Sequence, residues 1–261
     1  MKTRVISGII MLPLFIVVYL GGYFLMAACL IIGIMCVREF FNGFRNAGLN
    51  PCGLIAYASA AALYALNISG VDFKWHSLWF LAVVAASLLC GFIDKKRNMR
   101  DAAATITGIF YIVFFSYHIV LTAQIAGYSI LVWLVFISAF GTDMMAYFTG
   151  STLGKHKLCP EISPKKTVEG AIGGVIGSIA FCGIFGYFAA KGLMIDCLII
   201  GALGGILSQL GDLTASAFKR KMGIKDFSSM IPGHGGVLDR FDSVLFTAPM
   251  VYYYIMIVLV S

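Results

Sequence analysis

A polar stretch at residues 216–242 gathers acidic, basic, glycine and histidine residues in a chain of which only 12% is charged. Within it, Asp239 and Asp242 are three residues apart, and Asp212 precedes Ser216 by four residues. On a helix, both spacings place the side chains on one face. We therefore expect three carboxylates to meet where one apolar helix ends and the next begins.

The segment between these two helices is predicted to be a loop that can approach a phosphate closely. Its glycines permit tight turns and leave backbone N–H groups accessible. Basic residues flank the loop, and His234 lies inside it. Hard oxygen ligands beside basic side chains and a glycine turn suit a magnesium ion together with phosphates. The alternative is a juxtamembrane loop whose basic residues only hold orientation and contact anionic lipid, which accounts for the lysines but not for the aspartates.

Two motifs carry a resemblance to a known family. The first consists of Ser216, Phe218, Lys219, Arg220, Lys225, Asp226, Pro232, His234, Gly235, Gly236, Asp239, Arg240 and Asp242. The second is the sequence SPKKT at residues 163–167, followed by Glu169 and Gly170. Both resemble, without visible departure, elements of the phosphatidate cytidylyltransferases (CDP-diacylglycerol synthases). The size and layout of the rest of the chain are also similar to that family.

The resemblance implies a reaction in which the phosphate of phosphatidate attacks the α-phosphorus of CTP, giving CDP-diacylglycerol and pyrophosphate. For this chemistry we expect Mg²⁺ with Asp212 and Asp239 as first choices of ligand and Asp242 and Asp143 as secondary candidates, and a second monovalent or divalent cation is left open. Catalytic roles are expected for Asp212, Asp239, Asp242, Lys219 and His234. The residues expected to bind substrate are Asp143, Lys165, Lys166, Thr167, Ser216, Arg220, Lys225, Gly235, Gly236 and Arg240. How the basic residues divide between CTP and the lipid phosphate stays open.

The residues of the second motif also have a physical interpretation of their own. Thr167 is placed to cap the helix that follows it. Lys165 and Lys166 would then hold phosphate oxygens near the N-terminus of that helix. Asp143 lies inside a predicted span, where a carboxylate is costly unless it faces a polar interior, so it is a functional candidate. A helix–helix hydrogen bond is the alternative for Asp143.

The composition predicts an all-α fold, a polytopic bundle of transmembrane helices. Of the 261 residues, 60% are hydrophobic, and the mean hydropathy is +0.93, well above that of a soluble domain. Each span needs roughly 20 apolar residues. We predict about nine spans, at residues 5–21, 23–37, 53–69, 78–93, 106–126, 129–149, 171–190, 197–218 and 238–260.

The charge distribution predicts the orientation of these spans. If the N-terminus is cytoplasmic, all of the 19 lysines and arginines except Lys74 and Lys191 fall in inside segments. The net charge of +7 is then explained by topology, and no nucleic-acid partner is expected. We expect CTP, phosphatidate and membrane phospholipid as partners. The predicted location is the bacterial plasma (inner) membrane, with the active site on the cytoplasmic side.

The two halves of the chain are expected to differ in role. Residues 1–127 are predicted to be scaffold helices that face lipid, and residues 128–261 to form the catalytic region. In the first half, Arg38 and Glu39 are interpreted as an interfacial ion pair. In the second half, glycines at GxxxG spacing predict close helix packing, which leaves a homodimer open because one chain can satisfy the same stripes.

Three other functions compete with the cytidylyltransferase interpretation. A transporter would use the buried acids for ion coupling, but broken helices in two related halves would be expected, whereas the polar residues here concentrate in one half. A structural membrane protein leaves the carboxylates and the glycine–histidine loop unexplained. A lipid-alcohol kinase that uses CTP is the nearest rival among enzymes, and it would release CDP in place of pyrophosphate.

Overall fold

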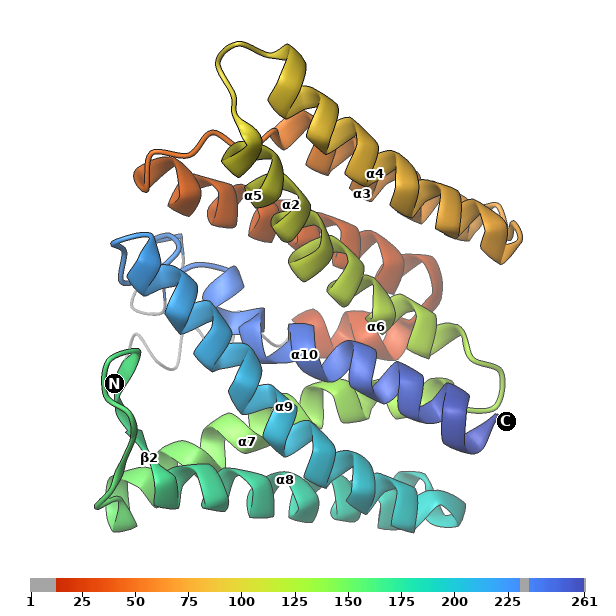
Figure 1. The fold of residues 1–261 in the computed structure, drawn as a ribbon. Coiled ribbons are helices and arrows are strands. Elements are labelled where there is room, and N and C mark those ends of the chain that lie inside the picture. The colour runs from red at the N-terminus through yellow and green to blue at the C-terminus, as the bar shows by residue number, and fades with distance from the viewer. Residues whose placement is uncertain (1–12, 231–234, 261) are drawn as a thin grey trace. The chain divides into compact units, whose positions relative to one another are not determined.

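The computed structural model describes residues 13–230 and 235–260, and in that part of the chain the helices fall into two compact units (Figure 1). The first unit comprises Met1–Phe115 and Lys221–Arg240, and the second comprises Ser116–Arg220 and Phe241–Ser261. The loop segment that carries much of the first motif therefore belongs with the N-terminal helices. The predicted boundary at residues 127/128 divides the chain into scaffold and catalytic parts. That division by function stays a prediction.

The first unit is built from helices of different lengths. They are α2 (Gly22–Asn46), α3 (Gly53–Ile68), α4 (Phe73–Ile93) and α5 (Met99–Gly108), which continues as a π-helical segment, Ile109–Phe114. Residues 13–20 are also helical. A capping box starts α5: the side chain of Asn98 accepts from the N–H of Asp101, and Asp101 Oδ2 accepts from the N–H of Asn98 at 2.9 Å.

The second unit contains the remaining helices and one hairpin. Its helices are α6 (Phe115–Gln124), α7 (Val132–Leu153), α8 (Val168–Ala189), α9 (Met194–Lys221) and most of α10 (Leu238–Tyr254), which is extended by a π-helical segment, Ile255–Leu259. Residues 238–240 of α10 belong to the first unit. Short 3-10 turns at Ser129–Leu131 and Lys191–Leu193 precede α7 and α9. Between α7 and α8, strands β1 (Lys157–Cys159) and β2 (Ser163–Thr167) pair antiparallel.

Small residues let α7, α8 and α9 approach closely, as the GxxxG spacing predicted. A Cβ atom at Gly174 would lie 3.1 Å from atoms of Thr142 on α7, and one at Gly205 would lie 3.0 Å from the Cα of Val175 on α8. α7 and α8 run side by side in Figure 1. Because a larger side chain at these positions would push the helices apart, the glycines fix the relative places of the residues on them.

At Gly211, α9 touches α10 backbone to backbone. A Cβ atom there would lie 2.6 Å from the carbonyl oxygen of Asp242 and 3.2 Å from the Cα of Ser243. Asp212 is the next residue on α9. The contact therefore brings two of the predicted site residues, one on each helix, next to each other.

The predicted fold class is confirmed. Seven helices of the described residues are long and apolar enough to cross a membrane, and Gly53–Ile68 is a shorter apolar helix. Each predicted span from 23–37 onward corresponds to one of these eight helices, while most of 5–21 lies outside the described residues. The orientation of the N-terminus stays a prediction.

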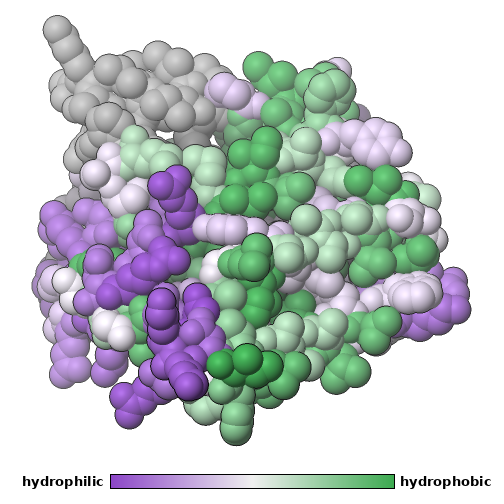
Figure 2. Space-filling view, turned by 90° about the horizontal axis from the view of Figure 1, so that it is seen from above, coloured by the Kyte–Doolittle hydropathy of each residue, from purple (hydrophilic) through white to green (hydrophobic). Residues whose placement is uncertain are grey.

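Large apolar side chains are exposed on several of these helices. On α4, Phe92 is 80% exposed, and Leu81 and Phe80 are exposed as well. Hydrophobic residues cover most of the face shown in Figure 2, and hydrophilic residues gather toward one side of it. Such wide apolar surfaces are unusual for a soluble monomer and are typical of helices that face lipid.

Candidate active site

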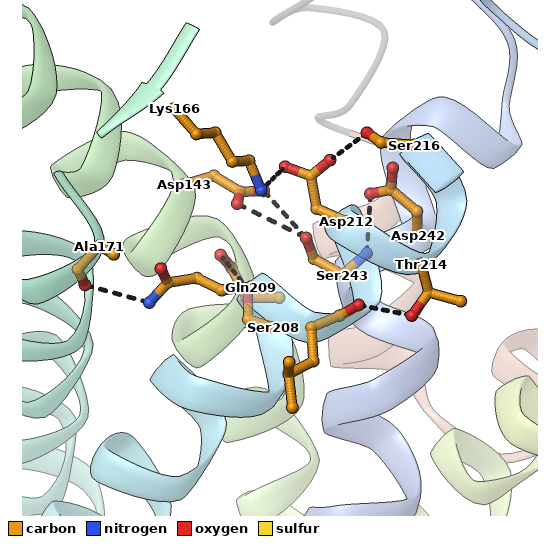
Figure 3. A network of polar contacts seen from close by, with 12 residues as sticks. Asp143, Lys166, Ala171, Ser208, Gln209, Asp212, Thr214, Ser216, Asp242 and Ser243 are labelled. Carbon is orange, nitrogen blue, oxygen red and sulfur yellow. Dashed lines mark hydrogen bonds and ion pairs between the residues drawn. The ribbon is translucent and has the colours of Figure 1, made fainter. Parts of the chain in front are cut away.

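The centre of the candidate site is an ion pair between the hairpin and α9. Lys166 Nζ lies 2.6 Å from Asp212 Oδ2, and Ser216 Oγ donates to the other oxygen of the same carboxylate at 3.3 Å. Figure 3 shows Lys166 reaching from β2 to Asp212. Ser216 is one turn after Asp212 on α9, as the four-residue spacing predicted. Both charged side chains are about a quarter exposed, so a ligand can reach them.

Two further carboxylates lie near this pair, on α7 and α10. The exposed carboxylate of Asp143 accepts from Ser243 Oγ at 3.4 Å, and Asp242 Oδ1 accepts from the backbone N–H of Ser243 at 2.8 Å. Asp242 is buried, and its carboxyl group interacts electrostatically with those of Asp212 and Asp143. In Figure 3 the three carboxylates come from three helices and gather in one region.

Basic side chains balance this negative charge. Lys219, one turn beyond Ser216 on α9, is buried and interacts electrostatically with Asp242. Lys166 supplies a second positive charge from the hairpin. Arg220 is exposed, and its Nε donates to the carbonyl of Ile162 at 3.2 Å, which ties the end of α9 to the turn between β1 and β2.

The hairpin separates the two lysines of the second motif. Successive residues of a strand point to opposite faces. In β2, Lys166 is partly buried and pairs with Asp212, whereas Lys165 is exposed. Only one of the two lysines therefore faces the carboxylates. The sequence predicted a loop that contains both lysines, and a loop prediction does not indicate which side chain is buried.

Contacts at the start of α8 hold the hairpin in place. Thr167 Oγ1 accepts from the N–H of Gly170 at 3.1 Å, which confirms the predicted helix cap. Glu169 accepts from the backbone N–H of Lys155 at 3.0 Å and pairs with His156 Nδ1 at 2.6 Å. Since these bonds join the end of α7 to the first turn of α8, they also fix the strand that carries Lys166.

The remaining predicted aspartate lies in the first unit and holds a loop. Asp239 Oδ2 accepts from the backbone N–H groups of Phe227 and Gly236, each at 2.9 Å. Gly235 has a φ of +81°, a backbone conformation that favours glycine. A Cβ atom at Gly235 would also lie 2.9 Å from the same Oδ2 atom. The glycines thus permit a close approach of the backbone to Asp239, and the approach to a phosphate stays a prediction.

Sequence reasoning missed one residue that contacts this loop. Glu39 on α2 was interpreted as an interfacial ion pair with Arg38, but the structure places its buried carboxylate against the loop. Ser228 Oγ and the N–H of Leu238 donate to it. A signal was present, because an acidic residue within an apolar helix is functional by default.

The other predicted residues have varied places. Lys225 and Arg240 are exposed in the first unit. His234 lies outside the described residues. The structure thus gathers Asp143, Lys166, Asp212, Ser216, Lys219 and Asp242 in the second unit, and Gly235, Gly236 and Asp239 in the first.

The donor set suits magnesium but does not form a closed cage. Within residues 13–230 and 235–260, no three histidine, cysteine, aspartate or glutamate side chains are grouped so that they could hold a metal ion. Mg²⁺ is commonly bound by one or two carboxylates and completes its shell with waters and substrate phosphates. Asp212 and Asp242 offer hard oxygens of that kind near one another, so the residues present fit this ion.

Comparison with known proteins gives a consistent result along the whole chain. The model of the cytidylyltransferase family matches residues 2–258. A protein named phosphatidate cytidylyltransferase from Synechocystis sp. is 32% identical, over 98% of this chain and 97% of the relative. Proteins of the same name from Staphylococcus haemolyticus and Staphylococcus aureus are 34% and 33% identical, each over 96% of this chain and 97% of the relative.

Proposed function

The chain belongs to the cytidylyltransferase family, and from that premise we propose that it is an integral membrane phosphatidate cytidylyltransferase. A phosphate oxygen of phosphatidate attacks the α-phosphorus of CTP and forms a new P–O bond. The bond from the α-phosphorus to the oxygen bridging it to the β-phosphate breaks, and pyrophosphate leaves. The products are CDP-diacylglycerol and pyrophosphate, as the names of the relatives suggest.

The cluster of Lys166, Asp212 and Asp242 carries this proposal. Transfer between two phosphates requires that their negative charges be neutralised and that the reacting atoms be positioned, with little covalent chemistry by the protein. Two lysines among three carboxylates supply both charge neutralisation and metal ligands in one place. No serine or cysteine nucleophile is needed, because phosphatidate brings its own oxygen.

Each side chain has a role in this scheme. Lys166 and Lys219 bind phosphate oxygens and reduce the repulsion between the two anionic substrates. Ser216 and Ser243 orient the carboxylates of Asp212 and Asp143 through the hydrogen bonds described above. Arg220, Lys225, Arg240 and Lys165 extend the positive charge toward the triphosphate and the lipid phosphate, and His234 donates to a phosphate oxygen.

Magnesium is the proposed cofactor, with Asp212 and Asp242 as its ligands, and Asp239 stays a ligand predicted from the sequence. When bound, it supplies Lewis-acid polarisation of the phosphate oxygens and neutralises the charge of the pyrophosphate.

The proposed location is the plasma (inner) membrane of a bacterium, with the site on the cytoplasmic side. CTP would enter from the cytosol and phosphatidate from the adjacent leaflet. The bacterial relatives and the distribution of lysine and arginine along the chain support this orientation.

One assay tests the proposal directly. Purified protein in detergent is given labelled CTP, phosphatidate and Mg²⁺, and both products are measured. We expect CDP-diacylglycerol and pyrophosphate in equal amounts. Release of CDP with phosphorylation of a lipid alcohol would identify a kinase, and solute movement in liposomes without lipid product would identify a transporter; either result overturns the proposal.

A further inference from the structure

We propose that Glu39 is a positioning residue for the start of α10 and for Asp239, which lies in its first turn. Glu39 is on α2, in the half of the chain where the sequence predicted only scaffold helices. The inference rests on the proposed function, because it assigns Glu39 to the site of that reaction. It adds a residue outside both sequence motifs.

The contacts of Glu39 all reach one segment. Oε1 accepts from Ser228 Oγ at 2.6 Å and from the backbone N–H of Val237 at 3.0 Å. Oε2 accepts from the backbone N–H of Leu238 at 2.8 Å. These donors are 189 to 199 residues away from Glu39 in the sequence. One side chain of α2 therefore contacts two described segments, one at residue 228 and one at residues 237–238.

Two of these donors belong to the beginning of a helix. The first N–H groups of a helix have no partner within it, and they must be satisfied from outside. Leu238 is the first residue of α10, and Val237 precedes it. A carboxylate at this position both accepts the unpaired N–H groups and interacts favourably with the helix dipole. Glu39 thus caps α10 from another helix.

Burial makes this arrangement specific. Glu39 is only 3% exposed, and a buried carboxylate is costly unless it is well hydrogen-bonded. The three donors from residues 228–238 provide that compensation. A Cβ atom at Gly236 would collide with the carboxylate of Glu39, so a glycine is required for the loop to lie this close.

The contact of Glu39 with Leu238 is next to a predicted site residue. Asp239 is the residue after Leu238, and its Oδ2 atom accepts from Phe227 and Gly236. Glu39 and Asp239 therefore hold the same two short segments, residues 227–228 and residues 236–238. If the cap is weakened, the first turn of α10 loosens and Asp239 loses its position.

The test uses the full chain with Glu39→Gln and a matched control, Asp101→Asn. Asp101 is a buried carboxylate in the same unit, 2% exposed, and it also accepts two backbone N–H groups, those of Asn50 and Asn98. It caps α5, and its hydrogen bonds go to Asn50 and Asn98, not to residues 227–239. A purely structural role for Glu39 would make the two variants behave alike.

Two measurements are made on protein that elutes as a single folded species. We expect Glu39→Gln to lower kcat about 10- to 100-fold, the range for partners that orient a ligand or catalytic group. The KM for CTP should change less than kcat, because displacement of an aspartate reduces the stabilisation of the transition state more than it reduces the affinity for CTP. Asp101→Asn should keep kcat near the wild-type value while unfolding at a lower temperature.

Hydrogen exchange reads the position of the helix without any turnover. Peptides covering residues 237–242 should exchange faster in Glu39→Gln than in the wild type, and should be unchanged in Asp101→Asn. If Glu39→Gln does not fold, Ser228→Ala replaces it, because this variant removes one of the three bonds and leaves Glu39 two partners. A loss in kcat of about twofold to tenfold is then expected, with the same peptides affected.

The outcomes separate this inference from the proposed function. Wild-type kcat and wild-type exchange at residues 237–242 in Glu39→Gln, or in Ser228→Ala if that variant is needed, would overturn the role of Glu39. A fall in kcat equal to that of Asp101→Asn, without faster exchange, would also overturn it. A wild-type protein that forms no CDP-diacylglycerol would overturn the proposed function, while the exchange data would still show whether Glu39 holds α10.

Discussion

Lys166 Nζ and Asp212 Oδ2 are 2.6 Å apart, and this contact joins the hairpin before α8 to the polar end of α9. Both side chains are partly exposed, at 24% and 28%. An exposed ion pair adds at most about 1 kcal/mol to stability. We therefore interpret the pair as a means of holding a positive and a negative group beside each other for substrate and metal binding.

The two lysines of the hairpin give a matched test of this interpretation. Lys166→Ala should lower kcat/KM for CTP by about tenfold to hundredfold, because hydrogen bonds to charged groups contribute about 1.5–3 kcal/mol. Lys165→Ala removes the same charge from the exposed face of the same strand and should have a clearly smaller effect. Steady-state kinetics at fixed ionic strength measures both. Equal losses would show that only the net charge of the hairpin matters.

The carboxylates should differ in how much activity depends on them. Asp212→Asn and Asp239→Asn are expected to abolish turnover in protein that still folds and inserts into the membrane. Asp143→Asn should cost less, since its carboxylate is exposed and its bonds to Ser243 Oγ are long, at 3.4 and 3.5 Å. Glu161→Gln, an exposed acid in the hairpin, serves as the control. Wild-type rates in Asp212→Asn or Asp239→Asn would remove that residue from the metal site.

The contact between α9 and α10 should be sensitive to a single methyl group. Gly211→Ala places a Cβ atom 2.6 Å from the carbonyl oxygen of Asp242, and overpacking of this kind costs about 1–3 kcal/mol. We expect a lower unfolding temperature in detergent and reduced activity. Gly192→Ala is the control, because a Cβ atom there would meet no atom within 4 Å. The same unfolding temperature in both variants would contradict the backbone contact.

Thr167 has a confirmed role as a helix cap and a predicted role in substrate binding, and two variants distinguish them. Thr167→Ala removes the bond to the N–H of Gly170 and should lower stability by about 1 kcal/mol. Thr167→Ser keeps the hydroxyl group and should retain both stability and activity. If Thr167→Ala loses stability but keeps the KM for CTP, Thr167 is a cap only, and its predicted contact with substrate is wrong.

Removal of divalent cations should stop the reaction reversibly. Treatment with a chelator is expected to abolish product formation, and addition of Mg²⁺ should restore it. The reason is that the ion supplies positive charge between the carboxylates and the triphosphate, which are both negative. The Asp242→Asn variant should need a higher Mg²⁺ concentration for half-maximal rate. Full activity after chelation, verified by elemental analysis of the protein, would contradict the magnesium proposal.

Local patterns allowed much of the fold and part of the site to be predicted. The apolar runs gave the helices, the four-residue spacing placed Ser216 beside Asp212, and Thr167 was identified as a cap from its position alone. Each of these depends on residues within one or two turns of each other, or on the composition of a single segment.

Contacts between distant segments could not be predicted in this way. The hairpin was missed because Ser163–Thr167 contains a proline and two lysines, which are uncommon in strands. Glu39 was misinterpreted because two of its partners are backbone N–H groups 198 and 199 residues away. Nearly every residue has a backbone N–H group, so the residue type does not show which one is the partner. The use of Asp239 Oδ2 to hold the loop depends on the same kind of partner.

The assignment of residues 221–240 to the N-terminal unit limits how the chain can be divided. A gene fragment that encodes residues 128–261 would contain both sequence motifs, yet the first turn of α10 would lack the carboxylate that accepts its N–H groups. Such a fragment would recover the native turn only when residues 13–115 are co-expressed with it. Recombination between relatives is therefore expected to succeed when α2 and the loop before α10 are inherited together.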